Sequence, residues 1–188
     1  MLQFIREYSK YVEITGFKKV KFPDAEAFLK AHRRNARQDL DLQFFDADLI
    51  ATRDHLQFAV LNALQAFGNG TNISKSLAVE TMLFASAQRQ IQKAIDRCGI
   101  KPQTTRMAAT VIGEKPSEIR TLLGEISVCV GSEPDESVLE LSDDKRRRIK
   151  EIFQVKGEEI EAVMEKENQD NAVVSLIVER VALLATQL

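Results

Sequence analysis

Apolar residues recur along this chain first with the spacing of a strand, then with that of a helix, and then with that of a strand again. Residues 12–21 alternate in polarity and are rich in β-branched side chains, and Asp24 can then cap a helix. Residues 40–44 alternate in the same way, and a helical pattern follows over 56–67 that we expect to end at Gly68. This change of period predicts an α/β (α+β) fold, in which a small mixed β-sheet packs against several helices.

The second half of the chain shows the same succession of strands and helices. Residues 107–112 are typical of a buried strand, and Pro116 can then begin a helix. We expect a short strand at 127–130 and an acidic loop over 131–141. Three further helices are predicted to complete the chain, at 142–153, 158–164 and 171–185.

A turn rich in glycine and asparagine at 68–72 leads into two apolar segments with helical spacing. We expect Asn72 or Ser74 to cap the first of these helices. The second helix covers residues 91–98. The polar residues 86–90 lie between the two segments, and the spacing alone leaves open whether they interrupt one long helix.

The length and charge of the chain limit its organisation and its ligands. With 188 residues the chain can bury a core without disulfides or metals, so we expect one domain over 1–188, with residues 1–10 as a candidate flexible segment. The 26 basic and 28 acidic side chains give a formal net charge of -2. Because there is no overall positive field, a long duplex is excluded as a ligand, and any contact with nucleic acid must be local.

The cysteines and the N-terminal residues are typical of an intracellular protein. Cys98 and Cys129 lie far apart and lack the paired spacing of a zinc site or redox motif, so we expect both to be reduced and buried. Charged residues follow the N-terminus too closely for a signal peptide, and no apolar run is long enough to span a bilayer. We therefore expect a cytoplasmic protein with no membrane partner.

Residues suited to catalysis are few. His32 and His55 each lack an acidic or cysteine partner at a useful spacing, so we expect surface or core-edge positions for both. Residues 68–71 are only faintly similar to a phosphate loop, because they lack the Gly-Lys-Ser/Thr ending and follow a helix. We predict a protein without enzymatic activity, bound metal or cofactor. A small hydrolase or transferase would need several acidic residues to converge in one pocket.

Basic residues form three groups that differ in their suitability for RNA. The group around Arg34 closes a helix, where cations interact favourably with the negative end of the helix dipole. This structural role and RNA binding are two interpretations that both stay open. Residues 145–148 follow two aspartates, and we expect internal charge pairing there. Lys75, Gln88 and Arg89 lie near helix starts, where exposed amides and the positive dipole add to the affinity for anions.

The last predicted helix is apolar on almost every side. Between residues 172 and 184 only Ser175, Glu179 and Arg180 are polar, and on a helical wheel they separate a broad apolar face from a narrower strip. The strip consists of Ala172, Leu176 and Leu183. Such a helix is normally buried. The pattern supports two interpretations equally, namely burial of both faces in the chain's own core or contact of one face with a partner.

One segment carries a family pattern: residues 72–91 read Asn-Ile-Ser-Lys-Ser-Leu-Ala-Val-Glu-Thr-Met-Leu-Phe-Ala-Ser-Ala-Gln-Arg-Gln-Ile. The pattern begins with a capped Ser-Lys-Ser-Leu and continues with a glutamate and an apolar stretch. It ends with a Gln-Arg-Gln-Ile helix start. The segment resembles the smallest-subunit family of the KEOPS complex, known in animals as the PRPK-binding protein. Residues 98–100 and 178–184 extend the resemblance, which covers most of the chain from Val12 onward.

The resemblance implies an α/β fold without enzymatic activity, in one subunit of a heteromeric complex. Such subunits bind and regulate the small atypical kinase or ATPase of the complex and recruit tRNA through its single-stranded 3′ CCA end, for the synthesis of threonylcarbamoyladenosine. The tRNA-binding residues would then be Asn72, Ser74, Lys75, Ser86, Gln88 and Arg89, to which we add Arg34. The kinase-binding residues would be Ala172, Leu176, Glu179, Arg180 and Leu183. A protein scaffold without RNA contact is the alternative.

Overall fold

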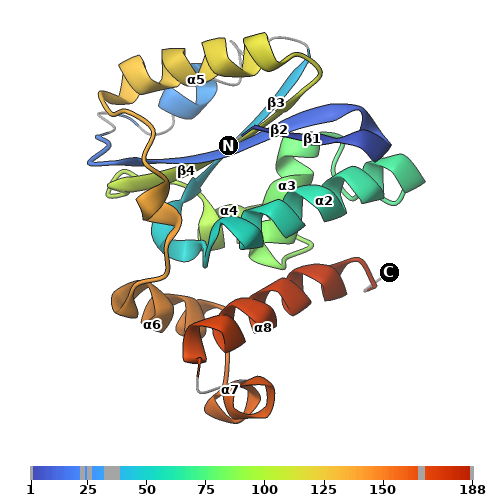
Figure 1. Cartoon of the computed structure of the whole chain (residues 1–188), viewed down its shortest axis with the longest axis vertical. Helices are drawn as coiled ribbons and strands as arrows, with labels where there is room; N and C mark the ends of the chain where they lie inside the picture. Colours follow the sequence, from blue (N-terminus) through green and yellow to red (C-terminus); the bar gives the residue numbers. More distant parts are fainter. Residues whose placement is uncertain (1, 22–23, 25–26, 32–38, 165–167, 187–188) are drawn as a thin grey trace.

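The computed structural model describes residues 2–21, 24, 27–31, 39–164 and 168–186. Its strands form one sheet in the order β1-β2-β4-β3 (Figure 1). They are β1 (Gln3–Ile5), β2 (Lys10–Lys18), β3 (Leu40–Asp46) and β4 (Arg106–Gly113). The α+β class is confirmed, but the mixed sheet is wrong, because every pairing of these strands is antiparallel. Strand β1, within residues 1–10, is an element that the alternation did not predict.

Strand β4 lies at the centre of the sheet and is buried on both faces. Met107, Ala109 and Val111 belong to one core cluster, while Ala108 and Ile112 belong to the other. Neighbouring side chains of a strand point to opposite faces, so a strand that is covered on both sides is apolar throughout. This explains why the central strand could be recognised as a continuous apolar run.

Helices cover both faces of the sheet (Figure 1). Helix α5 (Pro116–Val130) packs on one face, and helices α2 (Arg53–Asn69), α3 (Leu77–Ser86) and α4 (Ile91–Cys98) lie on the other. Helices α6 (Asp143–Ile152), α7 (Gly157–Val163) and α8 (Gln169–Leu184) form a further layer beyond α2. Short 3-10 turns are η1 (Arg6–Tyr8), η2 (Ala47–Leu49) and η3 (Glu136–Leu139).

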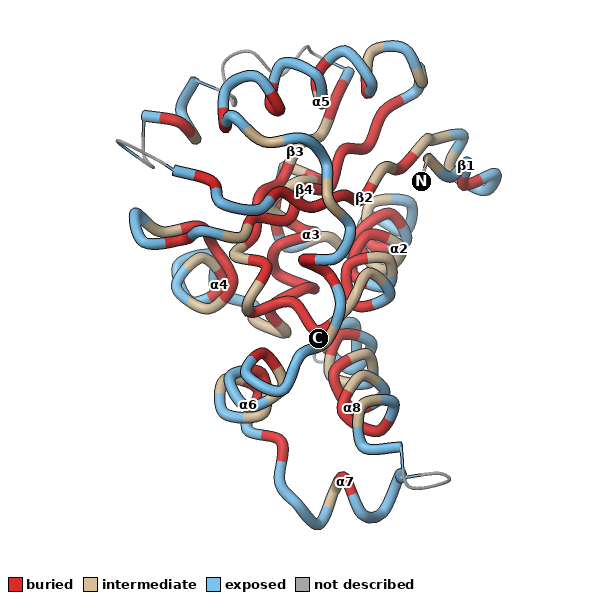
Figure 2. The backbone as a smooth tube through the Cα atoms, turned by 60° about the vertical axis from the view of Figure 1, so that its left-hand side comes forward, coloured by how far each residue is buried: buried red, intermediate tan, exposed pale blue. Residues whose placement is uncertain are grey.

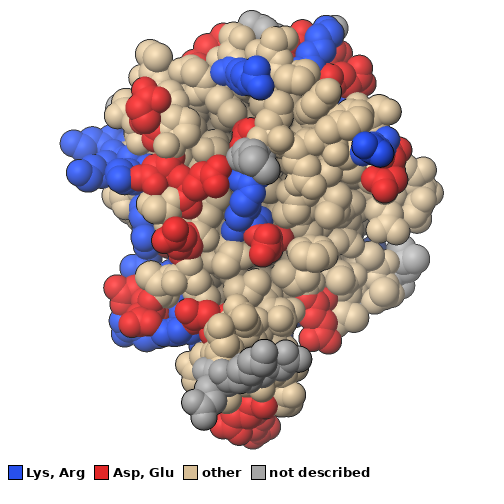
Figure 3. Space-filling model, viewed as in Figure 1, with Lys and Arg blue, Asp and Glu red and all other residues tan. Residues whose placement is uncertain are grey.

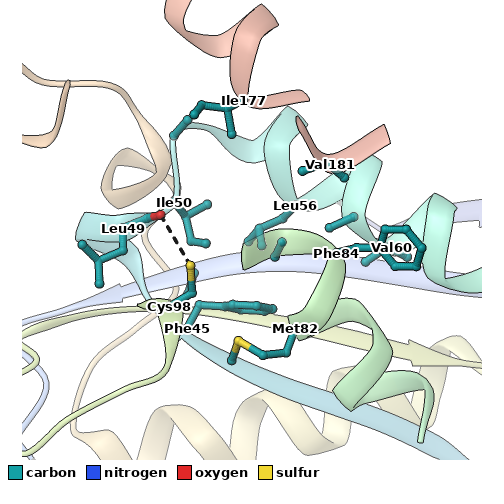
Figure 4. Packing of buried hydrophobic residues seen from close by; sticks show 14 of the residues in the cluster. Phe45, Leu49, Ile50, Leu56, Val60, Met82, Phe84, Cys98, Ile177 and Val181 are labelled. Atoms are coloured by element: carbon teal, nitrogen blue, oxygen red, sulfur yellow. Dashed lines mark hydrogen bonds between the residues drawn. The ribbon is translucent and has the colours of Figure 1, made fainter. Parts of the chain in front are cut away.

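The larger core cluster lies between the sheet and α8, with α2 and α3 inside it. Figure 4 shows Ile177 and Val181 of α8 near Leu56 and Val60 of α2, and Phe84 of α3 beside them. In Figure 2 the buried parts of the backbone run through the sheet, α2, α3 and the inner side of α8. One apolar face of α8 is therefore buried within this chain.

Two helix ends in the first half of the chain carry the types of residue that the sequence predicted. One of these ends lies later in the sequence than expected. Asp24 Oδ1 accepts the amide of Ala27 at 2.9 Å, which confirms the predicted cap. Helix α2 does not end at Gly68 but continues through Asn69, and Gly70 ends it with a left-handed φ of 68°. Glycine adopts this conformation without the steric cost of a Cβ, so the second glycine of the turn ends the helix.

The segment that resembles the family consists of a loop, a helix and a break. The N-cap of α3 is Ser76, whose Oγ accepts the amide of Val79 at 3.4 Å, so the prediction of Asn72 or Ser74 as the cap is wrong. A break does separate α3 from α4. Ala87 adopts a left-handed φ of 50° there and caps the C-terminal end of α3.

Residues 127–130 are the last turn of α5 and not a strand. Ile126 and Val130, four residues apart, are buried, while Val128 between them is 84% exposed. That is the periodicity of a helix face, and it outweighs the strand preference of the local β-branched residues. Gly131, with a φ of 63°, then ends the helix.

The two cysteines occupy different environments. Cys98 is fully buried, and its Sγ lies 4.0 Å from the carbonyl oxygen of Leu49 (Figure 4). Burial raises the pKa of the Cys98 thiol to about 12. Cys129 is exposed on α5, so the expectation that both cysteines are buried is wrong for Cys129.

The acidic loop is docked on strand β2 through its η3 turn. The amide of Asp135 donates to the carbonyl of Gly16 at 2.7 Å, and Val138 is buried. A Cβ on residue 16 would lie 1.9 Å from Val138 Cγ2, so only glycine permits this approach. Lys145 of α6 is fully buried and donates to the carbonyls of Val138 at 3.0 Å and Glu140 at 3.2 Å. Burial lowers the pKa of Lys145 to about 8.

Candidate nucleic-acid and partner interface

A buried carboxylate holds the loop of residues 71–76 that leads into α3. Glu80, in the first turn of α3, is 1% exposed. Its two oxygens each accept the amide of Ile73 at 3.1 Å, and Oε2 also accepts the amide of Ser74 at 2.7 Å. Hydrogen bonds from backbone amides to a carboxylate are among the stronger ones in proteins. Glu80 therefore fixes the path of the loop from inside the fold.

The loop residues predicted to bind tRNA differ in how accessible they are. Asn72 Nδ2 donates to the carbonyl of Ser74 at 2.9 Å, and Asn72 is half-buried. Ser74 is buried, and its Oγ accepts the amide of Ser76 at 3.2 Å. Lys75 is exposed. Asn72 and Ser74 thus shape the loop, and Lys75 is the member that is open to solvent.

At the break between α3 and α4, one predicted residue is inaccessible. Ser86 is fully buried, its Oγ donates to the carbonyl of Leu83 at 3.0 Å, and its own carbonyl accepts Arg97 Nη1 at 2.9 Å. The assignment of Ser86 to direct tRNA contact is therefore wrong, because its hydrogen bonds all lie inside the chain. Gln88 is half-buried, and its Nε2 donates to the carbonyl of Ala87 at 2.9 Å.

The loop and the break border two separate cavities. The first, of about 240 Å³, is the α2–α8 cavity and is lined by Asn62, Gln65, Ala66, Asn69, Thr71, Ile73, Glu80, Phe84, Arg89, Leu184 and Ala185. The second, of about 400 Å³, is the Tyr8 cavity and is lined by Tyr8, Lys10, Asp41, Leu64, Phe67, Gly68, Lys75, Ser76 and Leu77. The loop is a wall of both, with Arg89 at the first cavity and Lys75 at the second.

The basic group at 145–148 forms interactions within the chain. The predicted internal charge pairing is confirmed for Arg146, Arg147 and Arg148, whereas Lys145 donates to backbone carbonyls. The ion pairs join Arg146 to Asp143 and Asp170, Arg147 to Asp144, and Arg148 to Asp48. Arg34 lies outside the described residues.

The five residues of α8 predicted for partner contact differ in how far they are exposed. Ala172 and Leu176 are buried in the core of the chain itself, so their assignment to a partner surface is wrong. Arg180 is half-buried, and its Nη2 lies 3.0 Å from a carboxylate oxygen of α7. Leu183 is 46% exposed, and Glu179 is exposed as well. The accessible part of the strip is therefore its C-terminal end.

Known proteins are similar to this chain over most of its length. The family described as kinase binding protein CGI-121 matches residues 17–185. The regulatory protein Cgi121 of Methanocaldococcus jannaschii is 36% identical over 129 residues, which are 68% of this chain and 81% of that protein. This chain belongs to the CGI-121 family. The resemblance of residues 72–91 to the KEOPS subunit family is thereby confirmed.

The described histidine of this CGI-121 family member is a core residue. The amide of Ala51 donates to His55 Nδ1 at 3.1 Å, and His55 Nε2 lies 2.7 Å from the carbonyl oxygen of Ala85. These partners assign the ring proton to Nε2. Complete burial lowers the pKa of His55 to about 4. The expected surface or core-edge position is wrong for His55, and His32 lies outside the described residues.

A metal site in a protein needs at least three liganding side chains grouped in one place. Within residues 2–21, 24, 27–31, 39–164 and 168–186, no three His, Cys, Asp or Glu side chains come together in such a group. The helices of the same residues include none that combines the length and the apolar character needed to cross a bilayer.

Three residues of this CGI-121 site were not found from the sequence. Glu80 lies inside the family segment, and its signal was an acidic residue in an otherwise apolar helix. Tyr8 and Asp41 line the same cavity as Lys75 but come from distant parts of the chain. No local pattern at Tyr8 or Asp41 indicates that they meet Lys75.

Proposed function

We propose that this protein is a non-catalytic regulatory subunit of the KEOPS complex, which binds the small atypical kinase or ATPase and recruits tRNA through its 3′ CCA end in the cytoplasm. The name of the CGI-121 family supports the kinase contact. The observation that carries the tRNA contact is the loop fixed by Glu80, which borders two cavities, one lined by Arg89 and the other by Lys10 and Lys75. A scaffold without RNA contact is the alternative.

The charge distribution supports a local RNA contact. Lys75 and Arg89 are both exposed, and each lines one of the two cavities that the loop borders. A site with so few cations suits a short single strand, because a long duplex would require many more phosphate contacts. In this proposal Lys75 and Arg89 contact phosphates, while Asn72 and Gln88 contact base edges.

The kinase contact is assigned to the exposed C-terminal end of α8. Leu183 lies there with Glu179, and α8 runs along the outer side of the fold (Figure 1). Figure 3 shows a broad uncharged surface over the neighbouring helix α2, which has no charged residue after Asp54. Interfaces of this kind centre on apolar side chains with few charges.

Binding of tRNA separates the proposal from the scaffold alternative. The full chain is titrated by filter binding with intact tRNA and with tRNA that lacks its CCA end. Lys75→Glu or Arg89→Glu should weaken binding of intact tRNA about tenfold or more, since hydrogen bonds to charged groups contribute about 1.5–3 kcal/mol. The slope of log Kobs against log salt should be only about −0.7 to −1.4.

A charge reversal at a surface arginine serves as the matched control. Arg147 is 78% exposed and pairs with Asp144, so Arg147→Glu should have a smaller effect than either site variant. Equal binding of intact and trimmed tRNA by the unmodified protein would contradict the tRNA role. A dominant effect of Arg147→Glu would place the RNA contact on α6.

Copurification with the kinase tests the second contact. Leu183→Arg should abolish copurification, because it puts a charge into an apolar interface, while the monomer still melts cooperatively. Val128→Arg introduces the same charge at an 84% exposed apolar residue of α5, on the other side of the sheet, and should leave copurification unchanged. Unfolding of the Leu183→Arg monomer would show that Leu183 is a core residue.

A further inference from the structure

The Tyr8 cavity combines side chains that suit a nucleotide. Its volume of about 400 Å³ lies within the range of ligand pockets, about 300–1,000 Å³. Tyr8 comes from η1, Lys10 from β2, Asp41 from β3, Phe67 from α2 and Lys75 from the loop. Five separate segments therefore contribute to one concave surface at the edge of the proposed tRNA site.

Two aromatic rings line this cavity. Tyr8 and Phe67 are both half-buried, so each keeps part of its ring accessible. A Cβ on Gly68 would lie 3.2 Å from Tyr8 Cε1, so the absence of a side chain there lets the tyrosine ring lie against the end of α2. Proteins that bind single-stranded RNA commonly stack bases on such rings. The family segment 72–91 contains no accessible aromatic, and Tyr8 supplies one from outside it.

The polar groups of the cavity match the remaining parts of a nucleotide. Lys75 is exposed, and Lys10 is 28% exposed in an ion pair with Glu114 at 2.9 Å, so both can contribute to the attraction of a phosphate. Asp41 is half-buried, and burial raises the pKa of its carboxyl group, while the amide of Ala78 and the charge of Lys10 act in the opposite direction. A carboxylate oxygen accepts hydrogen bonds from the exocyclic amino group of cytosine.

We propose that the Tyr8 cavity is a second nucleotide subsite, which takes cytosine and recognises it through its exocyclic amino group. Tyr8 stacks on the base, Asp41 accepts from its amino group, and Lys75 with Lys10 attracts the adjoining phosphate. This subsite rests on the proposed tRNA function, because a strand that crosses the shared loop would enter both cavities.

Substitution of the aromatic ring tests the stacking. With intact tRNA as the probe, Tyr8→Ala should raise Kd about 5- to 10-fold, the low end of the loss seen when one stacked aromatic is removed. Tyr8→Phe keeps the ring and should bind like the unmodified protein. Phe4→Ala is the matched control, because Phe4 is a 46% exposed aromatic of β1 whose ring lies 4.7 Å from that of Tyr11 at a tilt of 40° and lines neither cavity.

Exchange of the bases tests the role of Asp41 independently of folding defects at Tyr8. A tRNA whose two terminal cytosines are replaced by uridines presents a carbonyl where cytosine has an amino group. The unmodified protein should bind it about tenfold more weakly than tRNA with the CCA end. Asp41→Asn adds an amide donor that suits uridine, while its oxygen can still accept the amide of Ala78. The ratio of the two Kd values should therefore fall toward one.

The outcomes distinguish this subsite from the proposed function as a whole. If the unmodified protein binds intact and trimmed tRNA equally, the tRNA function fails and the subsite fails with it. If Lys75→Glu and Arg89→Glu weaken binding but Tyr8→Ala, confirmed as folded by its melting curve, does not, then the subsite alone is wrong. An unchanged cytosine-to-uridine ratio in Asp41→Asn also overturns it.

Discussion

Removal of the Glu80 carboxylate tests whether the loop of residues 71–76 is held from inside the fold. Glu80 accepts the amides of Ile73 and Ser74 and is itself buried. Glu80→Gln keeps the size of the side chain and one acceptor oxygen, but replaces the other oxygen with a donor. Glu80→Ala removes both acceptors. Glu80→Gln therefore removes part of the hydrogen bonding that holds the loop, and Glu80→Ala removes all of it.

The expected loss follows from the burial of the two amides. Ser74 is 8% exposed, so its amide would remain buried without a partner, at a cost of about 1–3 kcal/mol. Ile73 is 41% exposed, so water can replace the carboxylate there and the loss is about 1 kcal/mol or less. We expect Glu80→Ala to lower the free energy of unfolding by about 2–4 kcal/mol and Glu80→Gln by about 1–2 kcal/mol.

Release of the loop should also weaken tRNA binding. Ordering one backbone residue costs about 1–2 kcal/mol, and in the variants tRNA binding has to supply this cost. Glu80→Gln should therefore raise Kd about tenfold, although Glu80 is only 1% exposed.

Urea unfolding and filter binding measure the two effects on the same variants. The unfolding midpoint should fall at an unchanged m value, which shows that stability and not compactness has changed. Glu151→Ala removes an exposed carboxylate of α6 and should shift neither quantity. If the free energy of unfolding of Glu80→Gln lies within about 0.5 kcal/mol of that of the unmodified protein, the carboxylate does not hold the loop.

Three further outcomes are expected. Gly16→Ala should lower the free energy of unfolding by about 1–3 kcal/mol, because the added Cβ collides with the η3 turn. Gly124→Ala should raise it by about 0.5–1 kcal/mol, because no atom lies within 4 Å of the added Cβ. Equal losses for the two variants in urea unfolding would contradict this. His55 has a folded-state pKa of about 4 against an ordinary 6.5, so it stays uncharged when folded and its contribution of about 3 kcal/mol is lost as the pH falls from 6.5 to 4. The dependence of unfolding free energy on pH in this range should become shallower in His55→Gln. An unchanged slope would show that His55 does not have a depressed pKa in the folded protein. In native protein Cys129 should react with iodoacetamide and buried Cys98 should not, so mass spectrometry should show one adduct before unfolding and two after it.

The sequence predicted the fold where the period of apolar residues was long enough to be distinctive. Strands β2, β3 and β4 and the helix around 171–185 were found in this way. Strand β1 has three residues, too few for an alternation to stand out. Residues 127–130 are rich in β-branched side chains, but the helical spacing of Ile126 and Val130 prevails, because tertiary packing overrides local propensity.

The candidate site was predictable only where a side chain had to be exposed. Lys75 and Arg89 are cations near helix starts, and such residues are seldom buried, so their accessibility could be inferred. Ser86 is a small polar residue that can satisfy itself on the carbonyl of Leu83, and nothing in its spacing showed its burial. Leu176 lies on an apolar strip, but a helical wheel does not show which neighbouring element covers the strip.

The end of α8 brings the two proposed contacts close together without making them one surface. Leu184 is 3% exposed and lines the α2–α8 cavity with Arg89, whereas its neighbour Leu183 is 46% exposed. Successive side chains of an α-helix point about 100° apart, so the residue that lines the tRNA cavity and the residue assigned to the kinase face different directions. A substitution at Leu183 can therefore disrupt the kinase contact while the cavity wall keeps its packing. The proposed kinase and tRNA contacts are for this reason separable by substitution, although both involve residues at the same helix end.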